Sequence, residues 1–236
     1  PQNLLQFKDV DFSNIHLRLK TKPKSLTFGR CLYTFEYQQQ HYWLKKQSLS
    51  SHSSVEAGFW NELVFYQQFS AQASSSSSMP DFLLPFQIIS HFKNLAESNL
   101  SGSAALILSD ADLLLDDCAG MSLQQIKQTF IKLLDAVEQL HQLGWIHGDL
   151  KREHLVAYQN RACLIDFEQV QKINAVHPLK SLTATPRYMA PELFQGADKT
   201  VQTDIYALGI ILYEWLSGQR LSAKNYHDWA YLHCQQ

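Results

Sequence analysis

The sequence predicts an α+β fold of two lobes, because strand patterns dominate its first half and helix patterns its second. Before residue 48, apolar and polar residues alternate in several places, as in half-buried strands. After residue 120, long stretches repeat their apolar residues with helical spacing. We expect a first lobe over 1–117 and a second over 118–236, together forming a single domain with a sizeable core.

Strands are predicted on both sides of a glutamine-rich turn, over Thr27–Tyr37 and His41–Lys45. Two shorter apolar runs, Ala105–Leu108 and Leu113–Leu115, are also typical of strands. Between these groups, Ala73–Ser78 contains five consecutive serines and is predicted to be a low-complexity loop.

Three helices are predicted, over residues 53–70, Ser122–Leu143 and Asp204–Ser217. The first begins with a capping signal, Ser53 to Glu56. The second has a continuous apolar face and ends at Gly144; this face is formed by Ile126, Phe130, Leu133, Leu134, Val137 and Leu140. The third is apolar nearly all round, so we expect it to be buried.

The segment with the clearest chemical pattern is His147–His154, which reads H-G-D-L-K-R-E-H. Asp166 follows Asp149 by 17 residues and opens Asp-Phe-Glu after another apolar run. Two aspartates in this arrangement suit phosphoryl transfer, in which one orients the attacking hydroxyl and the other holds the metal that neutralises the phosphates.

Two later segments complete a pattern that extends over about residues 20–225: Thr183–Glu192 reads T-A-T-P-R-Y-M-A-P-E, and Asp204–Gly209 reads D-I-Y-A-L-G. With the aspartate motifs, they resemble the protein-kinase superfamily, especially the bacterial eukaryotic-like serine/threonine kinases. The resemblance implies a two-lobed kinase-like fold with a β-rich N-lobe and a helical C-lobe. Kinase domains continue with further helices, one carrying an arginine that pairs with Glu192, so the C-lobe is expected to be truncated or incomplete.

The resemblance also assigns catalytic roles. Asp149 would orient the attacking hydroxyl, and Lys151 would steady the transferring γ-phosphate. Thr185 would bond the aspartate and the lysine and shape the floor for a peptide substrate. Asp204 would bond the backbone of the catalytic loop.

For nucleotide binding, the resemblance places Lys45 at the phosphates, paired with Glu62, 17 residues further on. Lys46 is the adjacent candidate, but strand alternation turns only one of the two inward. Gly29 is the one glycine left of the phosphate-covering loop.

The adenine site is predicted near Asp117 and Cys118, after a last N-lobe strand at Leu113–Leu115. The rival assignment puts that strand at Leu106–Ser109.

Metal binding would fall to Asp166 and His154, with Mg²⁺ or Mn²⁺ as the cofactor beside ATP. His154 occupies the place of a metal-binding asparagine, and an imidazole favours Mn²⁺ over Mg²⁺. The alternative is a histidine that only hydrogen-bonds Asp149 or Asp166. Glu168 replaces the usual glycine after Asp-Phe, which predicts a segment that changes conformation less readily.

Gly148 replaces the arginine that usually grips a phosphorylated activation loop, which argues against activation by such phosphorylation. Gly148 and His154 are also features of small-molecule and lipopolysaccharide-core kinases. The motif set as a whole nevertheless favours a protein kinase. The leading hypothesis is an ATP-dependent serine/threonine protein kinase that acts on a protein hydroxyl. The alternatives are a kinase for a glycan or other small molecule, and a pseudokinase that serves as a binding scaffold.

Composition sets broader limits. A net charge of −2 gives no electrostatic case for nucleic-acid binding, and no apolar run has the ~20 residues of a membrane span. The four cysteines show no paired framework, which favours buried free thiols in a reducing cytoplasm; they are Cys31, Cys118, Cys163 and Cys234.

Overall fold

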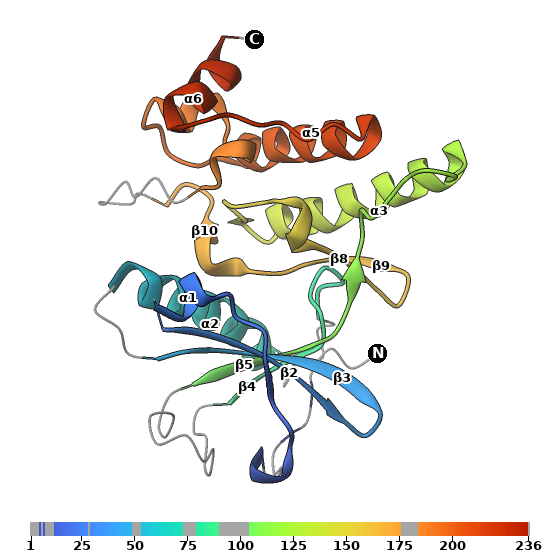
Figure 1. Cartoon of the computed structure of the whole chain (residues 1–236), viewed down its shortest axis with the longest axis vertical. Coiled ribbons are helices and arrows are strands. Elements are labelled where there is room, and N and C mark those ends of the chain that lie inside the picture. Colours follow the sequence, from blue (N-terminus) through green and yellow to red (C-terminus); the bar gives the residue numbers. More distant parts are fainter. Residues whose placement is uncertain are drawn as a thin grey trace. The chain divides into compact units, whose positions relative to one another are not determined.

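The protein is described here by a computed structural model that covers residues 5, 7, 12–27, 29–48, 53–72, 79–89, 104–175 and 184–235 (Figure 1). It forms two compact units, Pro1–Ala111 and Asp112–Gln236. The predicted boundary after residue 117 lies a short way inside the second unit. The serine-rich loop and Thr183 fall outside the described residues.

The first unit is built on a five-stranded sheet in the order β1-β2-β3-β5-β4, with every neighbouring pair antiparallel. Its strands are β1 (Arg18–Leu19), β2 (Arg30–Tyr37), β3 (Gln40–Gln47), β4 (Phe86–Ile89) and β5 (Ala105–Ser109). The predicted strand pair around a glutamine-rich turn is β2 and β3, joined at Gln38 and Gln39. This prediction is confirmed.

The segment before β2 differs from the prediction. Pro23–Thr27 forms the short helix α1, so Thr27 does not begin a strand. Proline suits a first helical position because its fixed φ is already helical. Gly29, at φ +78°, then turns the chain into β2, and its N–H donates to the Leu26 carbonyl at 2.9 Å.

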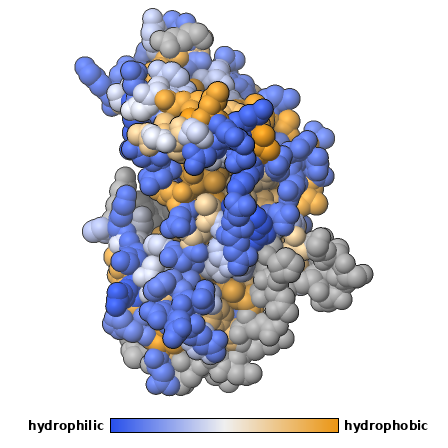
Figure 2. Space-filling model, turned by 90° about the vertical axis from the view of Figure 1, so that its right-hand side faces the viewer, coloured by the Kyte–Doolittle hydropathy of each residue, from blue (hydrophilic) through white to orange (hydrophobic). Residues whose placement is uncertain are grey.

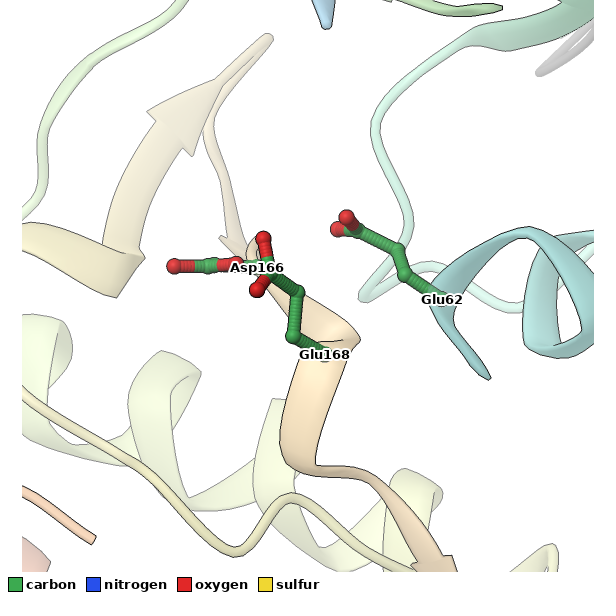
Figure 3. A group of neighbouring side chains, drawn as sticks. All are labelled: Glu62, Asp166 and Glu168. Carbon is green, nitrogen blue, oxygen red and sulfur yellow. The ribbon is translucent and has the colours of Figure 1, made fainter. Parts of the chain in front are cut away.

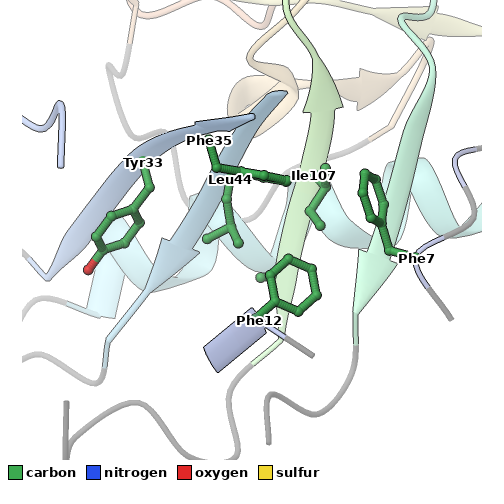
Figure 4. Packing of buried hydrophobic residues seen from close by; sticks show 7 residues of the cluster. Phe7, Phe12, Tyr33, Phe35, Leu44 and Ile107 are labelled. Atoms are coloured by element: carbon green, nitrogen blue, oxygen red, sulfur yellow. The ribbon is translucent and has the colours of Figure 1, made fainter. Parts of the chain in front are cut away.

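Helix α2 (Ser53–Gln72) confirms the predicted helix of the first unit and buries Phe59, Leu63 and Tyr66. The Tyr66 ring lies 4.6 Å from that of Phe86 on β4, which ties the helix to the sheet. A second cluster, shown in Figure 4, fills the unit's core with mostly aromatic side chains: Phe7, Phe12, Tyr33, Phe35, Leu44, Ala105 and Ile107.

Along the chain, β5 is the last strand of this sheet, although it lies in the sheet's interior. The preference for Leu113–Leu115 as the last strand of the first lobe is therefore wrong. β5 pairs with both β3 and β4, and all five of its residues are buried. An unbroken apolar run suits such an interior strand. The later run yields only β6 (Asp112–Leu113), which pairs with β8 of the second unit.

In the second unit, α3 (Leu123–Gln142) begins with a capping box between Ser122 and Gln125, as the predicted helix requires. Leu133, Val137 and Leu140 are buried along it, but Leu134 is 40% exposed. One residue turns a helix by about 100°, so Leu134 lies beside the apolar face and not on it.

Helix α5 (Val201–Ser217) is buried on one side only, which corrects the prediction of a helix buried all round. Its inner face carries Ala207, Leu208, Ile211, Leu212 and Trp215, whereas Ile205, Tyr213 and Leu216 are about half exposed. Figure 2 shows patches of hydrophobic surface among hydrophilic residues in the upper part of the view.

The remaining elements of the second unit are short. They are β7 (Trp145–Ile146), β8 (Leu155–Tyr158), β9 (Arg161–Leu164), β10 (Gln171–Lys172), α4 (Pro191–Phe194) and α6 (Tyr226–Cys234). β6, β8 and β9 form one antiparallel sheet, and β10 pairs with β7. Its described residues also form 3₁₀ turns at Arg152–His154, Phe167–Gln169 and Pro186–Tyr188. The first unit has a similar turn at Phe12–Asn14.

Two simpler expectations concern membranes and cysteines. Among the helices of the described residues, none is both long and apolar enough to cross a bilayer. All four cysteines are free thiols, as predicted, although only Cys163 is buried.

His233 on α6 is a buried titratable group in the packing of the second unit. Its ring stacks on those of Phe194 and Trp229, each at 5.7 Å, and its Nδ1 lies 2.8 Å from the Tyr206 hydroxyl. Burial lowers the pKa of His233, and the carbonyls of Pro186 and Arg187 oppose this shift only partly.

We predict that His233 makes the protein less stable in acid. In the unfolded chain the imidazole takes up a proton below pH ~6.5, whereas in the folded chain it resists protonation, so stability falls as pH drops below that value. Urea unfolding of His233→Phe between pH 7.5 and 5.5 should show a smaller loss than the wild type. The same change at exposed His227 should leave the wild-type slope intact, and equal slopes for all three proteins would contradict the prediction.

Candidate active site

A hairpin brings two parts of the phosphotransfer motif together. In β8 and β9, Leu155 pairs with Leu164, so the residues just outside this pair, His154 and Ile165, are also adjacent. The Ile165 N–H donates to the His154 carbonyl at 3.1 Å. Asp166 follows in a left-handed conformation (φ 65°, ψ 65°) that turns the chain out of the strand. The hairpin therefore sets His154 beside Asp166.

The three residues predicted to be catalytic lie together in the second unit. Oδ1 of Asp149 accepts hydrogen bonds from the Thr185 N–H at 2.9 Å and from its hydroxyl at 2.8 Å. Oδ2 lies 3.6 Å from the Lys151 ammonium. One carboxylate oxygen is thus fixed by Thr185, while the other is paired more loosely with a lysine.

The loop that carries Asp149 is held by Asp204, at the start of α5. This buried carboxylate accepts the backbone N–H of His147 at 2.8 Å and that of Gly148 at 2.9 Å. A ring nitrogen of His141 on α3 lies 2.9 Å from the same carboxylate. The predicted bond between Asp204 and the loop backbone is confirmed.

His147 ties this loop to the segment before Asp166. Its Nε2 lies 3.0 Å from the carbonyl oxygen of Ile165, which can only accept, so Nε2 carries the proton. Nδ1 then accepts the Asp149 N–H at 3.4 Å. Burial lowers the pKa of His147, and nearby His154 adds to the effect, which favours this neutral ring.

His154 is oriented in the same manner. Its Nδ1 lies 3.0 Å from the Asp149 carbonyl oxygen and must donate to it. Its Nε2 lies 3.0 Å from Oδ2 of Asp166. A histidine that donates one N–H to a backbone carbonyl is set up to coordinate a metal through its other nitrogen. The contact fits two neighbouring metal ligands, and it equally fits a hydrogen bond from a protonated ring.

Glu168 is a candidate metal ligand that the sequence reasoning missed. Figure 3 shows it with Asp166 on the segment after β9, and shows Glu62 on α2 of the first unit. A carboxylate oxygen of Glu168 lies within 4.8 Å of one of Asp166. The sequence did contain a signal, since a second carboxylate two residues after a metal-binding aspartate stands on the same turn.

The predicted ion pair of the first unit is formed: Lys45 Nζ lies 2.6 Å from Oε2 of Glu62, which is fully buried. Strand alternation turns Lys46 to the opposite face of β3, as expected, but there it is fully buried as well. The lysine next to Lys45 is therefore part of the sheet's packing.

The residues predicted to contact adenine lie in the second unit. Oδ1 of Asp117 accepts the Ala119 N–H at 2.9 Å, and the Cys118 thiol donates to the Trp215 carbonyl at 3.2 Å. Both line a cavity of about 410 Å³ that also contains Arg152 and Glu153. The assignment depended on a strand that belongs elsewhere, so the backbone after β5 becomes the better candidate.

Comparison with known proteins agrees with the geometry. The family model described as "Protein kinase domain" matches residues 95–236. A probable serine/threonine-protein kinase, gdt4, of Dictyostelium discoideum is 33% identical over 105 residues, 42% of this chain and 6% of that protein. A dual serine/threonine and tyrosine protein kinase of Apis mellifera is 38% identical over 122 residues, which are 50% of this chain and 12% of that protein.

A third relative, the probable serine/threonine-protein kinase PknB of Lactococcus lactis, is 35% identical over 91 residues, which are 37% of this chain and 14% of the relative. The matched segments thus span only a small part of these relatives. The family model, in contrast, covers more than half of the chain, including both aspartate motifs and α5. On this basis the chain belongs to the protein kinase domain family.

Proposed function

We propose that the chain is an ATP-dependent serine/threonine protein kinase that transfers the γ-phosphate to a protein hydroxyl. The observation that carries the proposal is the arrangement around Asp149, where one carboxylate oxygen is fixed by Thr185 and the other lies near Lys151. A carboxylate held in this way can orient a hydroxyl with its second oxygen.

The acceptor hydroxyl would bond to Oδ2 of Asp149, because Oδ1 is already occupied by two hydrogen bonds from Thr185. Lys151 would steady the charge of the transferring group with its ammonium, a point charge well suited to phosphate. Thr185 comes directly before the Pro186–Tyr188 turn, so it links the catalytic loop to the segment proposed to support the acceptor peptide.

A divalent cation would be held by Asp166, with His154 and Glu168, each near its carboxylate, as the candidate further ligands. The chemistry it supplies is neutralisation of the phosphate charge during transfer. Two oxygen ligands and one nitrogen ligand suit Mn²⁺ better than Mg²⁺, which prefers oxygen alone. The His154 ring is already oriented for this role by its bond to the Asp149 carbonyl.

Binding of the ATP phosphates would involve Lys45, whose ammonium is fixed by Glu62. Gly29 remains a weaker candidate, because its N–H already donates to Leu26. For the adenine, backbone groups directly after β5 are proposed in place of Asp117 and Cys118, since β5 is the last strand of its sheet.

A binding scaffold explains this constellation less well than an enzyme does. A scaffold has no physical need for a fixed aspartate, a lysine beside it and a separate buried lysine–glutamate pair. The relatives named above are described as serine/threonine or dual-specificity protein kinases, which favours a protein acceptor over a glycan.

We expect Asp149→Asn to lower phosphate transfer by at least ~10²-fold while nucleotide binding is retained, because the change removes the group that positions the acceptor. Transfer from labelled ATP to a generic protein substrate, with Mn²⁺ or Mg²⁺, measures the first effect, and calorimetric titration with ATP measures the second. Asp135→Asn, at an exposed carboxylate of α3, is the matched control.

Equal transfer by wild type and Asp149→Asn would contradict the catalytic role. Label that appears only on a sugar acceptor would replace the protein-kinase proposal with a small-molecule kinase. Absence of nucleotide binding in the wild type would favour a scaffold.

A second prediction concerns Glu62. Glu62→Gln keeps the shape of the side chain but removes the charge that fixes Lys45, so turnover should fall by roughly tenfold or more. Steady-state kinetics with ATP as the varied substrate measure the loss, and Glu36→Gln at an exposed position of β2 should behave as wild type. Unchanged kinetics in Glu62→Gln would remove the ion pair from the mechanism.

A third prediction separates the two roles of His154. If the ring binds the cation, His154→Asn should shift the ratio of Mn²⁺-supported to Mg²⁺-supported activity toward Mg²⁺, because an amide oxygen is the harder ligand. Electron paramagnetic resonance of bound Mn²⁺ would report the nitrogen ligand directly. A ratio that stays at the wild-type value would show that His154 only braces the loop.

A further inference from the structure

Gly148 occupies a position that can carry no side chain. Its φ of +78° is in the left-handed region, and a Cβ placed there would lie 2.6 Å from the backbone oxygen of Gln169. Contacts this short with a backbone atom cannot be relieved by turning a side chain. The sequence has glycine where other kinases have arginine, and the local backbone leaves no room for an arginine at this position.

The space beside Gly148 is filled by Lys199, which comes from the segment just before α5. Its Cδ lies 3.0 Å and its Nζ 3.1 Å from the point where a Cβ of Gly148 would be. The ammonium donates to Oε1 of Gln169 at 3.4 Å, and the Lys199 carbonyl accepts from the Gln171 side chain at 3.2 Å. Two glutamines of the segment after Asp166 thus hold this lysine in place.

Lys199 is also set among negative charges. Burial lowers the pKa of Lys199, while the carboxylates of Asp149 and Asp204 act in the opposite direction and favour its charged form. A half-buried cation is stable only when such partners offset its loss of hydration. The same two aspartates orient the acceptor and hold the loop backbone, so the lysine is coupled to both.

We propose that Lys199 is a positioning residue that supplies, from the fold itself, a cation beside the catalytic loop. In kinases with an arginine before the catalytic aspartate, that arginine joins the loop to a phosphorylated activation segment. Here the ammonium of Lys199 lies beside Gly148 of the loop and donates to Gln169, without any phosphate. The loop is consequently set for transfer in the unphosphorylated protein, an inference that rests on the proposed kinase function.

Lys199 is a second cation near Asp149, beside Lys151, and the two lysines have different tasks in the proposed reaction. Lys151 is the nearer cation to Asp149, but in the proposed reaction its ammonium turns to the transferring phosphate. Lys199 is held by Gln169 and lies beside Gly148, so it does not need to change partner during transfer. It can therefore keep the loop in one arrangement while Lys151 changes partner.

The test compares Lys199→Met, which keeps the length of the stem without its charge, with Lys199→Arg and with Lys224→Met at an exposed position. We expect kcat to fall roughly tenfold in Lys199→Met while KM for ATP stays within about twofold, because orientation is lost and nucleotide binding is not. Lys199→Arg should retain most of the activity. Phosphatase treatment of the wild type should leave its activity unchanged.

A kcat for Lys199→Met within about twofold of wild type, or equal losses in Lys199→Met and Lys199→Arg, would overturn the inference. So would a wild type that is inactivated by phosphatase. Melting temperatures separate these results from simple unfolding, since a positioning role predicts a normal melting temperature for Lys199→Met.

Amide hydrogen exchange provides a readout that does not need activity. The N–H groups of Gly148 and Thr185 should exchange faster in Lys199→Met than in wild type or Lys199→Arg. If the wild type transfers no phosphate, the proposed function is wrong, and this difference in exchange still supports the positioning role. Identical exchange in all variants overturns it.

Discussion

The Asp204 carboxylate is the interaction on which the site of the second unit depends. It is buried at the start of α5 and binds two successive N–H groups of the loop that carries Asp149. Buried N–H groups without partners are costly, so this loop can leave regular structure only because a carboxylate satisfies them. His141 on α3 meets the same carboxylate, so the two long helices of the unit and the loop share a single anchor.

Part of this arrangement could be expected from the sequence, through the motifs that resemble the kinase family. The resemblance implied that Thr185 bonds Asp149 and that Asp204 bonds the loop backbone, and the structure forms both contacts. Strand alternation required that only one of Lys45 and Lys46 face inward, and Lys45 was chosen because it directly follows an apolar pair; alternation survives tertiary packing because the side chains of a strand point to opposite faces. Strand alternation is local geometry, so neighbouring residues alone are enough to predict it.

The sequence failed where burial depends on partners that are distant in the chain. Leu113–Leu115 and Ala105–Ser109 are both apolar runs, and only pairing with β3 and β4 selects the second as an interior strand. The apolar composition of α5 likewise did not reveal which side would be covered, and Ile205 remains 52% exposed. Lys199 was overlooked because nothing in its own segment indicates that it fills the space beside Gly148, which depends on a fold contact across about fifty residues of chain.

The departures from the kinase pattern are linked by shared contacts and are not independent losses. Gly148 lacks a side chain, and the adjacent space holds Lys199. His154 replaces an asparagine, and its Nδ1 bonds the backbone of the very aspartate that orients the acceptor. Glu192 accepts a hydrogen bond from Thr203 beside Asp204. Each substitution is thus matched by a contact to the same loop or its anchor.

Restoring one family residue alone would disturb a neighbour that has adapted to its absence: a side chain at position 148 would have to displace both Lys199 and the backbone of Gln169.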